Sequence, residues 1–417
     1  MTTQAAPALR LELAKRWAES RDETDRLFGI LRTSALYDRP IPERHRIVFY
    51  IGHLETFDWN LLRHYLDLER FHAEFDQLFA FGIDPVDGGL PQDQASDWPT
   101  LTQVETYRRR IRRELDTALM DATESEELVQ LMNIAIEHRL MHAETLEYMF
   151  HQLPYSAKIR PAAERTVATV PVNVEMMALP AGIATLGLKR NSGQFGWDNE
   201  FESHSIEVPA FSIDKYKVTN REFRRFVEEG GYNARPLWSE ADWNWRTNAG
   251  IFHPVFWIPA ENGFRYRGMF EEIALPLDSP VYVSHAEASA HARWAGKALP
   301  TEVEWQRAAD GAEPPVETRT LWDPPAVGSG IGLASTYGVE GLLGTGWEWT
   351  SSLFAPFPDF QTVPAYPGYS ANFFDGKHFV MKGGSTRTAA CMLRRSFRNW
   401  FQAHYQYVYA GFRCVAR

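Results

Sequence analysis

The chain has 417 residues, of which 44% are hydrophobic and 23% charged; this composition is typical of a globular protein of two or three domains and excludes a disordered chain. Its formal net charge of −11 provides no overall positive field for nucleic acid or an anionic membrane, so we expect neither as a partner. The sequence has no apolar leader segment and no uncharged apolar run of about 18 residues, so we expect a cytoplasmic protein.

Helical periodicity extends from the start of the chain to about residue 154, with apolar residues at every third or fourth position. The pattern predicts a bundle of four long helices, over residues 9–31, 44–68, 101–120 and 125–153. Segment 81–99 is rich in Gly, Pro and Asp and has no helical period, so we expect a long loop that crosses the end of the bundle. The stretch 156–173, interrupted by Pro and Ala, predicts a linker.

The sequence changes character from residue 174 onward. Apolar runs become short, Gly and Pro recur every few residues, and most of the 14 tryptophans occur there. This pattern predicts an irregular α+β domain whose core is built from large aromatic side chains, with helices over 220–230 and 286–295.

Three histidines on the predicted helices are candidate metal ligands. His138 and His142 are four residues apart, so both imidazoles project from one face of the fourth helix. His53 lies midway along the second helix, at a height that an antiparallel bundle can match to them. Imidazoles without a thiolate suit zinc, iron or nickel, and open coordination positions indicate catalysis. Glu55 or Glu144 could replace one histidine, and the histidines could also be ordinary buried or surface side chains.

Six ordered motifs beyond residue 174 match a known domain: ALPAGIATLGL, IDKYKVTNREFRRFVEEGGY, PVYVSHAEASAHARWAGKALPTEVEWQRAA, GTGWEWTSS, FVMKGGSTR and YAGFRCVAR. With them, residues 174–417 resemble the formylglycine-generating-enzyme/sulfatase-modifying-factor domain, which has a C-type-lectin-like fold. Residues 1–155, with GHLETFDWN and EHRLMHAETL, resemble the DinB-like four-helix bundle that binds a metal with three histidines. Together the two domains resemble the non-haem iron sulfoxide synthases of ergothioneine and ovothiol biosynthesis.

The resemblance implies roles for individual residues. In the family, one histidine of the second helix and two of the fourth bind Fe(2+), and they match His53, His138 and His142. The family's second domain contributes residues to the reaction, and by its place in the motif AYPGYSANFFDGKH we assign Tyr366 as the proton donor. The same likeness implies the substrate-binding residues Tyr369, Arg395, Arg398, Asn399, Trp400, Phe401 and Met141.

Within this set, the aromatic rings would hold the quaternary ammonium of the substrate, and the arginines would bind carboxylates. We favour Arg398 over Arg395, because the latter could pair with the protein's own acids. Taken alone, RRSFRNW would also fit a basic surface strand. Met141 stands where some relatives have a glutamine, which is a departure from the family's imidazole pocket.

Two further departures bear on activity. Relatives that use γ-glutamylcysteine have an arginine-bearing clamp in the crossing loop, but no Lys or Arg occurs between Arg70 and Arg108 here, so we expect free cysteine as the thiol. A formylglycine-generating enzyme itself needs a pair of neighbouring thiols, and Cys391 and Cys414 do not form such a pair in the sequence. We expect both cysteines to be small, buried hydrophobic residues.

The resemblance therefore implies an iron(II)- and O2-dependent sulfoxide synthase, which forms a C–S bond between the imidazole of hercynine and cysteine. Three alternatives stay open at this point. They are a 5-histidylcysteine sulfoxide synthase of ovothiol biosynthesis, a selenoneine-type synthase, and a non-catalytic lectin-like binding protein with a structural metal.

Overall fold

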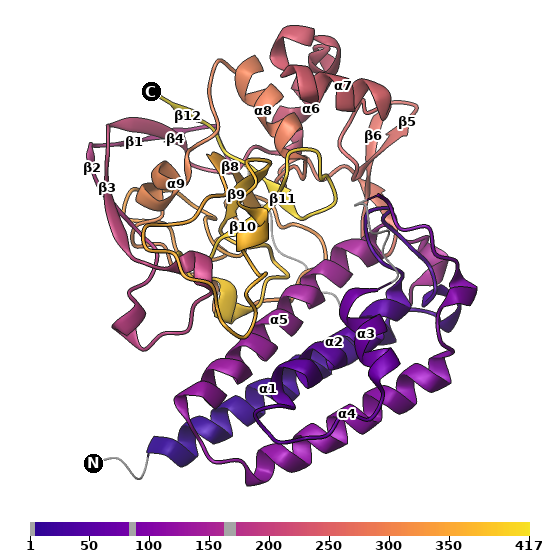
Figure 1. The fold of residues 1–417 in the computed structure, drawn as a ribbon. Coiled ribbons are helices and arrows are strands. Elements are labelled where there is room, and N and C mark those ends of the chain that lie inside the picture. The colour runs from indigo at the N-terminus through magenta and orange to yellow at the C-terminus, as the bar shows by residue number, and fades with distance from the viewer. Residues whose placement is uncertain (1–4, 83–88, 162–171) are drawn as a thin grey trace. The chain divides into compact units, whose positions relative to one another are not determined.

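The computed structural model describes residues 5–82, 89–161 and 172–417 (Figure 1). The chain divides into two compact units, Met1–Ala162 and Ala163–Arg417. The division falls within the stretch 156–173 that the sequence predicts as a linker, and residues 162–171 of that stretch lie outside the described part of the chain.

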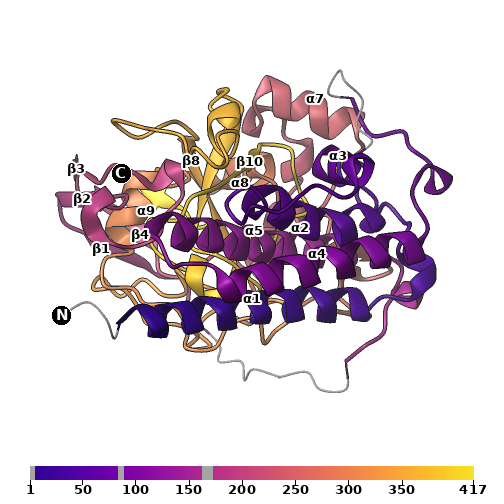
Figure 2. The same ribbon diagram turned by 60° about the horizontal axis from the view of Figure 1, so that its bottom comes forward.

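The first unit is helical. Its helices are α1 (Ala5–Gly29), α2 (Ile47–Leu62), α3 (Ala73–Phe81), α4 (Leu101–Asp121) and α5 (Glu126–His151). The long helices α1, α2, α4 and α5 occur where helical periodicity predicts them, and Figures 1 and 2 show them running side by side. The hydroxyls of Thr100 and Ser125 accept hydrogen bonds from the backbone amides of Gln103 and Leu128, which caps the starts of α4 and α5.

Two details of the first unit differ from the prediction. Helix α2 ends at Leu62 rather than at residue 68; the chain continues in turns through residues 63–67, and Asp67 has a left-handed φ of +53°. Helix α3 occupies a stretch between α2 and α4 for which no helix was predicted, and it packs on α2. Phe75 and Phe79, both buried, form its apolar face, so tertiary packing stabilises this nine-residue helix.

The second unit combines short helices with short strands. Its helices are α6 (Asn220–Glu228), α7 (Glu240–Asn248), α8 (His285–Trp294) and α9 (Glu302–Ala308). Its strands are β1 (Met176–Leu179), β2 (Gly182–Leu186), β3 (His204–Val208), β4 (Phe211–Asp214), β5 (Trp257–Ala260), β6 (Gly263–Arg267), β7 (Glu272–Ala274), β8 (Trp347–Leu353), β9 (His378–Lys382), β10 (Asn399–Gln402), β11 (Ala410–Gly411) and β12 (Val415–Ala416). Helices α6 and α8 were predicted; α7 and α9 were not.

The strands form four small sheets, with the orders β1-β4-β12, β10-β9-β8-β11, β2-β3 and β5-β6-β7. Ile213 of β4 pairs with Met177 on one side and Val415 on the other, both antiparallel, so the beginning and the end of the unit share one sheet. In the four-stranded sheet, β9 joins β8 to β10, and β10 carries the motif residues from Asn399 onward. The unit is therefore an irregular α+β domain, as the sequence indicates.

Large aromatic side chains fill the core of the second unit, as predicted. Trp197, Trp305 and Trp349 are fully buried. A buried ion pair lies beside Trp305, in which Arg413 donates to both carboxylate oxygens of Glu348 at 2.7 and 2.8 Å. The indole of Trp305 donates to the same carboxylate at 3.1 Å, so this charge has partners on several sides.

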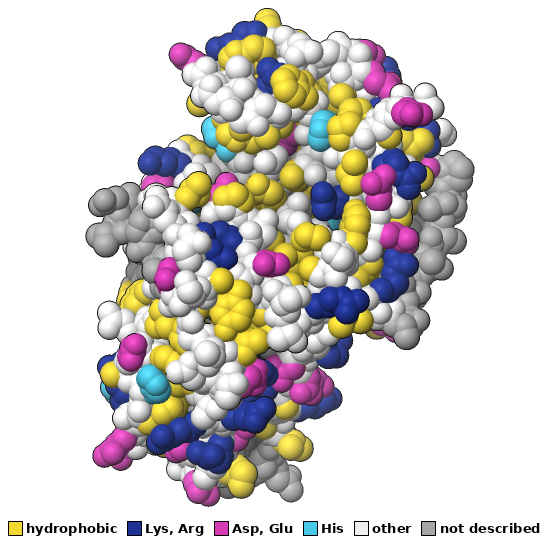
Figure 3. All heavy atoms as spheres, turned by 90° about the vertical axis from the view of Figure 1, so that its right-hand side faces the viewer, with side chains coloured by type: hydrophobic (Ala, Val, Ile, Leu, Met, Phe, Trp, Pro, Cys, Tyr) yellow, Lys and Arg dark blue, Asp and Glu magenta, His cyan; other side chains and the backbone are white. Residues whose placement is uncertain are grey.

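Two observations concern the expectation that neither nucleic acid nor a membrane is a partner. On the face drawn in Figure 3, basic and acidic side chains are interspersed with hydrophobic ones rather than gathered by sign. In the described parts of the chain, no helix is both long enough and apolar enough to cross a membrane.

Candidate metal centre

The three histidines predicted as metal ligands converge within the first unit. His53 projects from α2, while His138 and His142 project from α5. One ligand nitrogen of each ring lies within 4.8 Å of the other two, and the Nε2 atoms of His53 and His142 are 3.2 Å apart. The two helices therefore bring together one residue from α2 and two from successive turns of α5.

A hydrogen bond sets the tautomer of His53. Its Nδ1 donates to the carbonyl oxygen of Phe79 at 2.7 Å, so Nδ1 carries the proton and Nε2 presents a lone pair. Burial lowers the pKa of His53 to about 4 and lowers those of His138 and His142 well below the ordinary value, so the three imidazoles are neutral near pH 7. Neutral nitrogens that converge in a buried space fit a divalent transition metal such as Fe(2+).

Aromatic rings pack against the ligand imidazoles. Phe57 stacks on His138 with ring centroids 3.4 Å apart, and Phe49 stacks on His53 at 4.8 Å. Phe49, His53 and Phe57 follow one another at intervals of four residues, so they share one face of α2. Sequence reasoning missed both phenylalanines, although this spacing identifies them.

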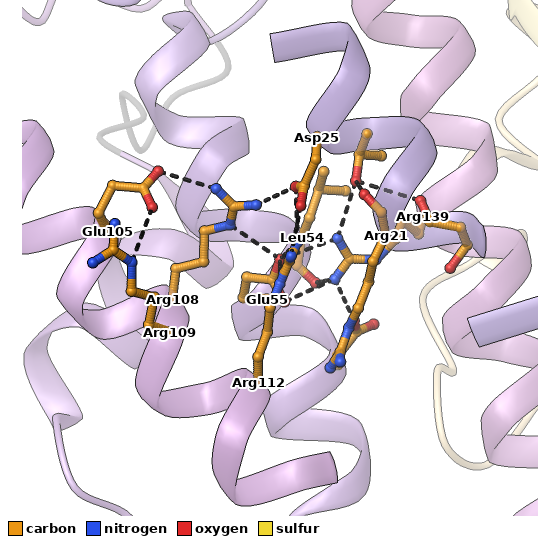
Figure 4. Close-up of polar contacts among 12 residues, drawn as sticks. Arg21, Asp25, Leu54, Glu55, Glu105, Arg108, Arg109, Arg112 and Arg139 are labelled. Atoms are coloured by element: carbon orange, nitrogen blue, oxygen red, sulfur yellow. Dashed lines mark hydrogen bonds and ion pairs between the residues drawn. The ribbon is translucent and has the colours of Figure 1, made fainter. Parts of the chain in front are cut away.

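The alternative ligand Glu55 is held elsewhere. Its carboxylate accepts hydrogen bonds from Arg139 at 3.0 and 3.2 Å and from Arg112 at 2.7 and 2.9 Å (Figure 4). Burial alone would raise the pKa of Glu55, but these guanidinium groups outweigh it and hold the pKa well below its ordinary value. Glu144 is buried on α5 and does not belong to the cluster of converging ligand atoms. The two-histidine, one-carboxylate set is therefore not the arrangement that the structure presents.

The ion pairs of Glu55 extend through the helical unit. Arg139, beside His138 in the sequence, is 1% exposed and also pairs with Asp58 and donates to the carbonyl of Leu54 at 3.0 Å. Arg112 and Arg108 of α4 both bond to Asp25 of α1, as Figure 4 shows. The basic run of α4 is thus partly turned inward; it is not simply a solvated face.

The crossing segment is anchored by Asp93. This buried carboxylate accepts hydrogen bonds from Arg46 at 2.9 Å and from the indole of Trp98 at 2.7 Å, and it also pairs with Arg39. Burial would raise the pKa of Asp93, but the indole and the two arginines hold it below the ordinary value. Residues 83–88 of the predicted loop lie outside the described part of the chain.

Three of the four predicted aromatic residues of the second unit form one cluster. Tyr369 stacks on Trp197 with centroids 3.9 Å apart and meets the edge of Trp400 at 5.3 Å. The ring centroids of Tyr366 and Tyr369 are 5.8 Å apart, and burial raises the pKa of the Tyr366 hydroxyl. Trp400 also stacks on Phe354 at 4.1 Å. Tyr366, Tyr369 and Trp400 are thus brought together within this unit.

The two predicted arginines have protein partners. Arg398 is buried, and it donates to both oxygens of Glu302 at 2.8 and 3.0 Å and to the carbonyls of Asn199 and Ala355 at 3.1 Å. Arg395 is part-exposed and donates to Asp310 at 3.1 Å. The preference for Arg398 as the partner of a substrate carboxylate is therefore not supported, because its guanidinium already serves a buried carboxylate.

The remaining predicted residues occupy varied positions. Asn399 accepts from the backbone amide of Trp400 at 2.8 Å, and Phe401 stacks on Tyr405 at 4.8 Å. Met141 is half-buried on α5, directly before His142. Cys414 is buried, as expected, whereas Cys391 is only half-buried, and neither forms a disulfide.

The second unit matches a known protein family. Residues 162–323 and 315–417 match the model of the sulfatase-modifying factor enzyme 1-like domain, and the chain belongs to this family. The resemblance read from the six motifs is thereby confirmed for the second unit.

Several relatives of the chain have names drawn from ergothioneine biosynthesis. The chain is 40% identical over 237 residues to a protein of Mycobacterium tuberculosis named Hercynine oxygenase, in an alignment covering 52% of this chain and 55% of the relative. It is 26% and 29% identical to proteins of Neurospora crassa and Schizosaccharomyces pombe named Ergothioneine biosynthesis protein 1, in alignments covering 93% of this chain and 55% and 53% of those relatives. The chain therefore spans about half the length of the relatives it matches. These relatives confirm the resemblance to the ergothioneine-biosynthesis family.

Proposed function

We propose that this protein is an iron(II)- and O2-dependent sulfoxide synthase that joins the imidazole carbon of hercynine to the sulfur of cysteine. The convergence of His53, His138 and His142 carries the proposal, because three neutral nitrogens within 4.8 Å of one another are a donor set for a catalytic metal. The names of the relatives, which point to hercynine and to ergothioneine, favour this substrate over the other imidazoles.

The three histidines would hold the ion. Ferrous iron, when bound, supplies the affinity for O2 and the electron transfer that no side chain can provide. The hydrogen bond from His53 to Phe79 keeps one imidazole oriented with Nε2 available. Phe49 and Phe57, stacked on the ligand rings, keep water from those faces.

The aromatic cluster of the second unit supports a role in substrate binding. A trimethylammonium group carries a charge that cannot donate hydrogen bonds, so it binds best over aromatic faces. Trp400 and Tyr369 each have one face stacked on a protein ring, that of Phe354 and Trp197 respectively. We propose their remaining faces, with Phe401, as the surfaces that bind the hercynine cation.

Tyr366 is proposed as the proton donor. Burial raises the pKa of its hydroxyl, so the side chain keeps its proton at neutral pH and can deliver it during the reaction. Delivery of this proton would favour coupling of sulfur to the imidazole over oxidation of the thiol to a sulfinic acid.

Free cysteine is proposed as the thiol. A longer γ-glutamyl substrate would bring a further carboxylate, which needs a cation. Segment 71–107 contains no Lys or Arg, and the nearby Arg39 and Arg46 are already paired with Asp93. Arg112 likewise serves Asp25 and Glu55.

Anaerobic iron loading followed by a substrate-pair screen tests the function. The purified protein should bind one ferrous ion per chain and should consume O2 only when hercynine and cysteine are both present, with the sulfoxide identified by mass spectrometry. His53→Ala, His138→Ala and His142→Ala should each abolish stoichiometric iron binding.

The exposed His64 provides the matched control, because His64→Ala also removes an imidazole from the helical unit. Iron binding and turnover should then equal those of the unmodified protein. If His142→Ala retains full iron and full turnover, the ligand assignment is wrong.

A further inference from the structure

We propose that α3 is a positioning element of the metal centre and that Gly52 is the residue that admits it. The last turn of α3 holds His53 in the tautomer that directs Nε2 to the ion. This inference rests on the proposed role of His53 as a ligand, and it assigns a function to a helix that sequence reasoning did not anticipate.

The contact uses a backbone group that the helix itself leaves open. The carbonyls of the last turn of a helix have no amide partner within it. In α3 the amide of Gly82 donates to the carbonyl of Leu78 at 2.7 Å, and the next carbonyl, that of Phe79, accepts from Nδ1 of His53 at 2.7 Å. The partial negative charge at this helix end favours a donor there, so it stabilises the proton on Nδ1.

Gly52 makes this approach of α3 to α2 possible. A Cβ atom at residue 52 would lie 2.3 Å from Cδ1 and 2.4 Å from Cγ of Phe79. The ring of Phe79 is fully buried, and Cγ lies close to the backbone, so a small rotation cannot relieve the clash. Any residue larger than glycine would therefore push the turn that carries the Phe79 carbonyl away from His53.

A second glycine, Gly82, allows the end of α3 to lie close to His45. Gly82 has a φ of +77°, and a Cβ there would lie 2.3 Å from Cε1 of His45. His45 packs on Phe49 with centroids 4.1 Å apart, and Phe49 stacks on His53 at 4.8 Å. The end of α3 is thus packed closely against His45, which is linked to His53 through the ring of Phe49.

The middle of α3 is fixed independently of the metal ligands. The buried carboxylate of Asp76 accepts from the hydroxyl of Tyr107 at 2.6 Å and pairs with Arg70 at 3.0 Å. The same Tyr107 hydroxyl lies 3.0 Å from that of Thr56, which ties α3 to α2 and α4. The helix is therefore held in place by α2 and α4, and a displacement at Gly52 acts on its last turn.

Gly52→Ala tests the proposal, with Co(2+) as the probe. Loss of a hydrogen-bond partner to a metal-binding histidine typically costs about 10–100-fold in metal affinity. We expect that loss by titration of the full chain followed by absorption spectroscopy. In the metal-free protein, ¹⁵N shifts of the imidazole should show His53 leaving the pure Nδ1–H tautomer. Gly29→Ala is the control, because a Cβ at that position meets no atom within 4 Å.

Two variants of Phe79 separate positioning from stability. Phe79→Ala should lower the urea concentration at the midpoint of unfolding, because a cavity forms, yet keep Co(2+) affinity, because the backbone carbonyl remains. Gly52→Ala/Phe79→Ala should recover affinity toward that of Phe79→Ala alone, since the ring that collides is gone.

Unchanged affinity and an unchanged tautomer in Gly52→Ala overturn the proposal, and so does a double variant as weak as Gly52→Ala. If the unmodified protein binds no Co(2+), the proposed function fails. The ¹⁵N shifts of the metal-free protein then still report whether α3 sets the tautomer of His53.

Discussion

Replacing Arg139 by methionine should destabilise the helical unit strongly, because the guanidinium is the shared partner of two buried acids. Arg139 is 1% exposed, and it pairs with Glu55 at 3.0 Å and with Asp58, which are 1% and 0% exposed. Methionine preserves much of the apolar volume and removes the charge. Breaking a buried ion pair from one side costs about 3–5 kcal/mol, because the other charge stays buried.

The two acids are not affected equally. Glu55 keeps its bonds to Arg112, at 2.7 and 2.9 Å, so its carboxylate remains paired in the variant. Burial raises the pKa of Asp58 to about 6 even with Arg139 present, and loss of Arg139 should raise it further. Most of the cost therefore arises at Asp58.

The pH dependence identifies the cause. In the variant the folded chain holds a proton on Asp58 at pH values where the unfolded chain, with a pKa near 3.9, has lost it. Folded stability therefore rises as pH falls, by up to about 1.4 kcal/mol per pH unit for one proton. Because the wild-type carboxyl already takes up its proton near pH 6, the deficit of the variant should be larger at pH 8 than at pH 6.

Urea unfolding followed by circular dichroism at 222 nm, at pH 6 and pH 8, measures both effects. Arg109→Met is the matched control, since the Arg109 side chain is 80% exposed and its nearest acid is 3.9 Å away. That change should stay within about 0.5 kcal/mol. Equal losses for Arg139→Met and Arg109→Met, or a loss for Arg139→Met that is the same at both pH values, would refute the reasoning.

Three further predictions can be checked directly. Tyr366→Phe should keep iron and substrate affinity but shift the product from the sulfoxide toward cysteine sulfinic acid, and an unchanged product ratio in mass spectrometry would remove Tyr366 from the mechanism. Competition assays should give free cysteine a higher kcat/KM than γ-glutamylcysteine; the reverse order would point to a cation not yet assigned. Burial lowers the pKa of His291 to about 3, and neither ring nitrogen has a hydrogen-bond partner among the described residues, so the unfolded chain alone takes up this proton below about pH 6.5. The contribution of neutral His291 to the free energy of unfolding is therefore fully present above that pH and is lost as the pH falls below it. Between pH 7.5 and pH 5 the free energy of unfolding, measured by urea titration, should fall by about 2 kcal/mol less in His291→Leu than in the unmodified protein.

The long helices could be predicted from the sequence because each repeats an apolar stripe over several turns. Helix α3 could not, because nine residues hold too few turns for a periodic signal and the helix depends on Phe75 and Phe79 packing on α2. Helix α9 has a signal that was overlooked, since Thr301 and Glu304 form a capping box that is legible in the sequence.

The strand order of the second unit could not be predicted from sequence patterns. Strand β12 pairs with β4, and β11 pairs in parallel with β8, across long separations in the sequence. Eleven of the twelve strands described have only two to five residues, which carry almost no alternation, and their partners are set by the packing of the whole unit.

At the candidate site, the i, i+4 spacing predicted that His138 and His142 share one helix face, and the mid-helix position of His53 in an antiparallel bundle predicted that it meets them. It could not predict the partners of charged residues. Arg398 looked available for a substrate carboxylate, but the carboxylate of Glu302, distant in sequence, accepts hydrogen bonds from its Nε and Nη2. Glu55 looked like a possible ligand, but its carboxylate accepts hydrogen bonds from Arg112 of α4 and Arg139 of α5. Such pairings depend on tertiary neighbours that residue type alone does not reveal.

The anchoring of the crossing segment at Asp93 has a consequence for divergence among relatives. Between residues 89 and 99, only Asp93 and Trp98 are buried, and these two hold the segment through Arg39, Arg46 and each other. The intervening side chains are mostly exposed, so mutations there cost little stability. The exposed residues of this segment can therefore be substituted during evolution, for example by an arginine, while the helices of the unit remain unchanged. A change of thiol preference would then need only a few substitutions in one short stretch of chain.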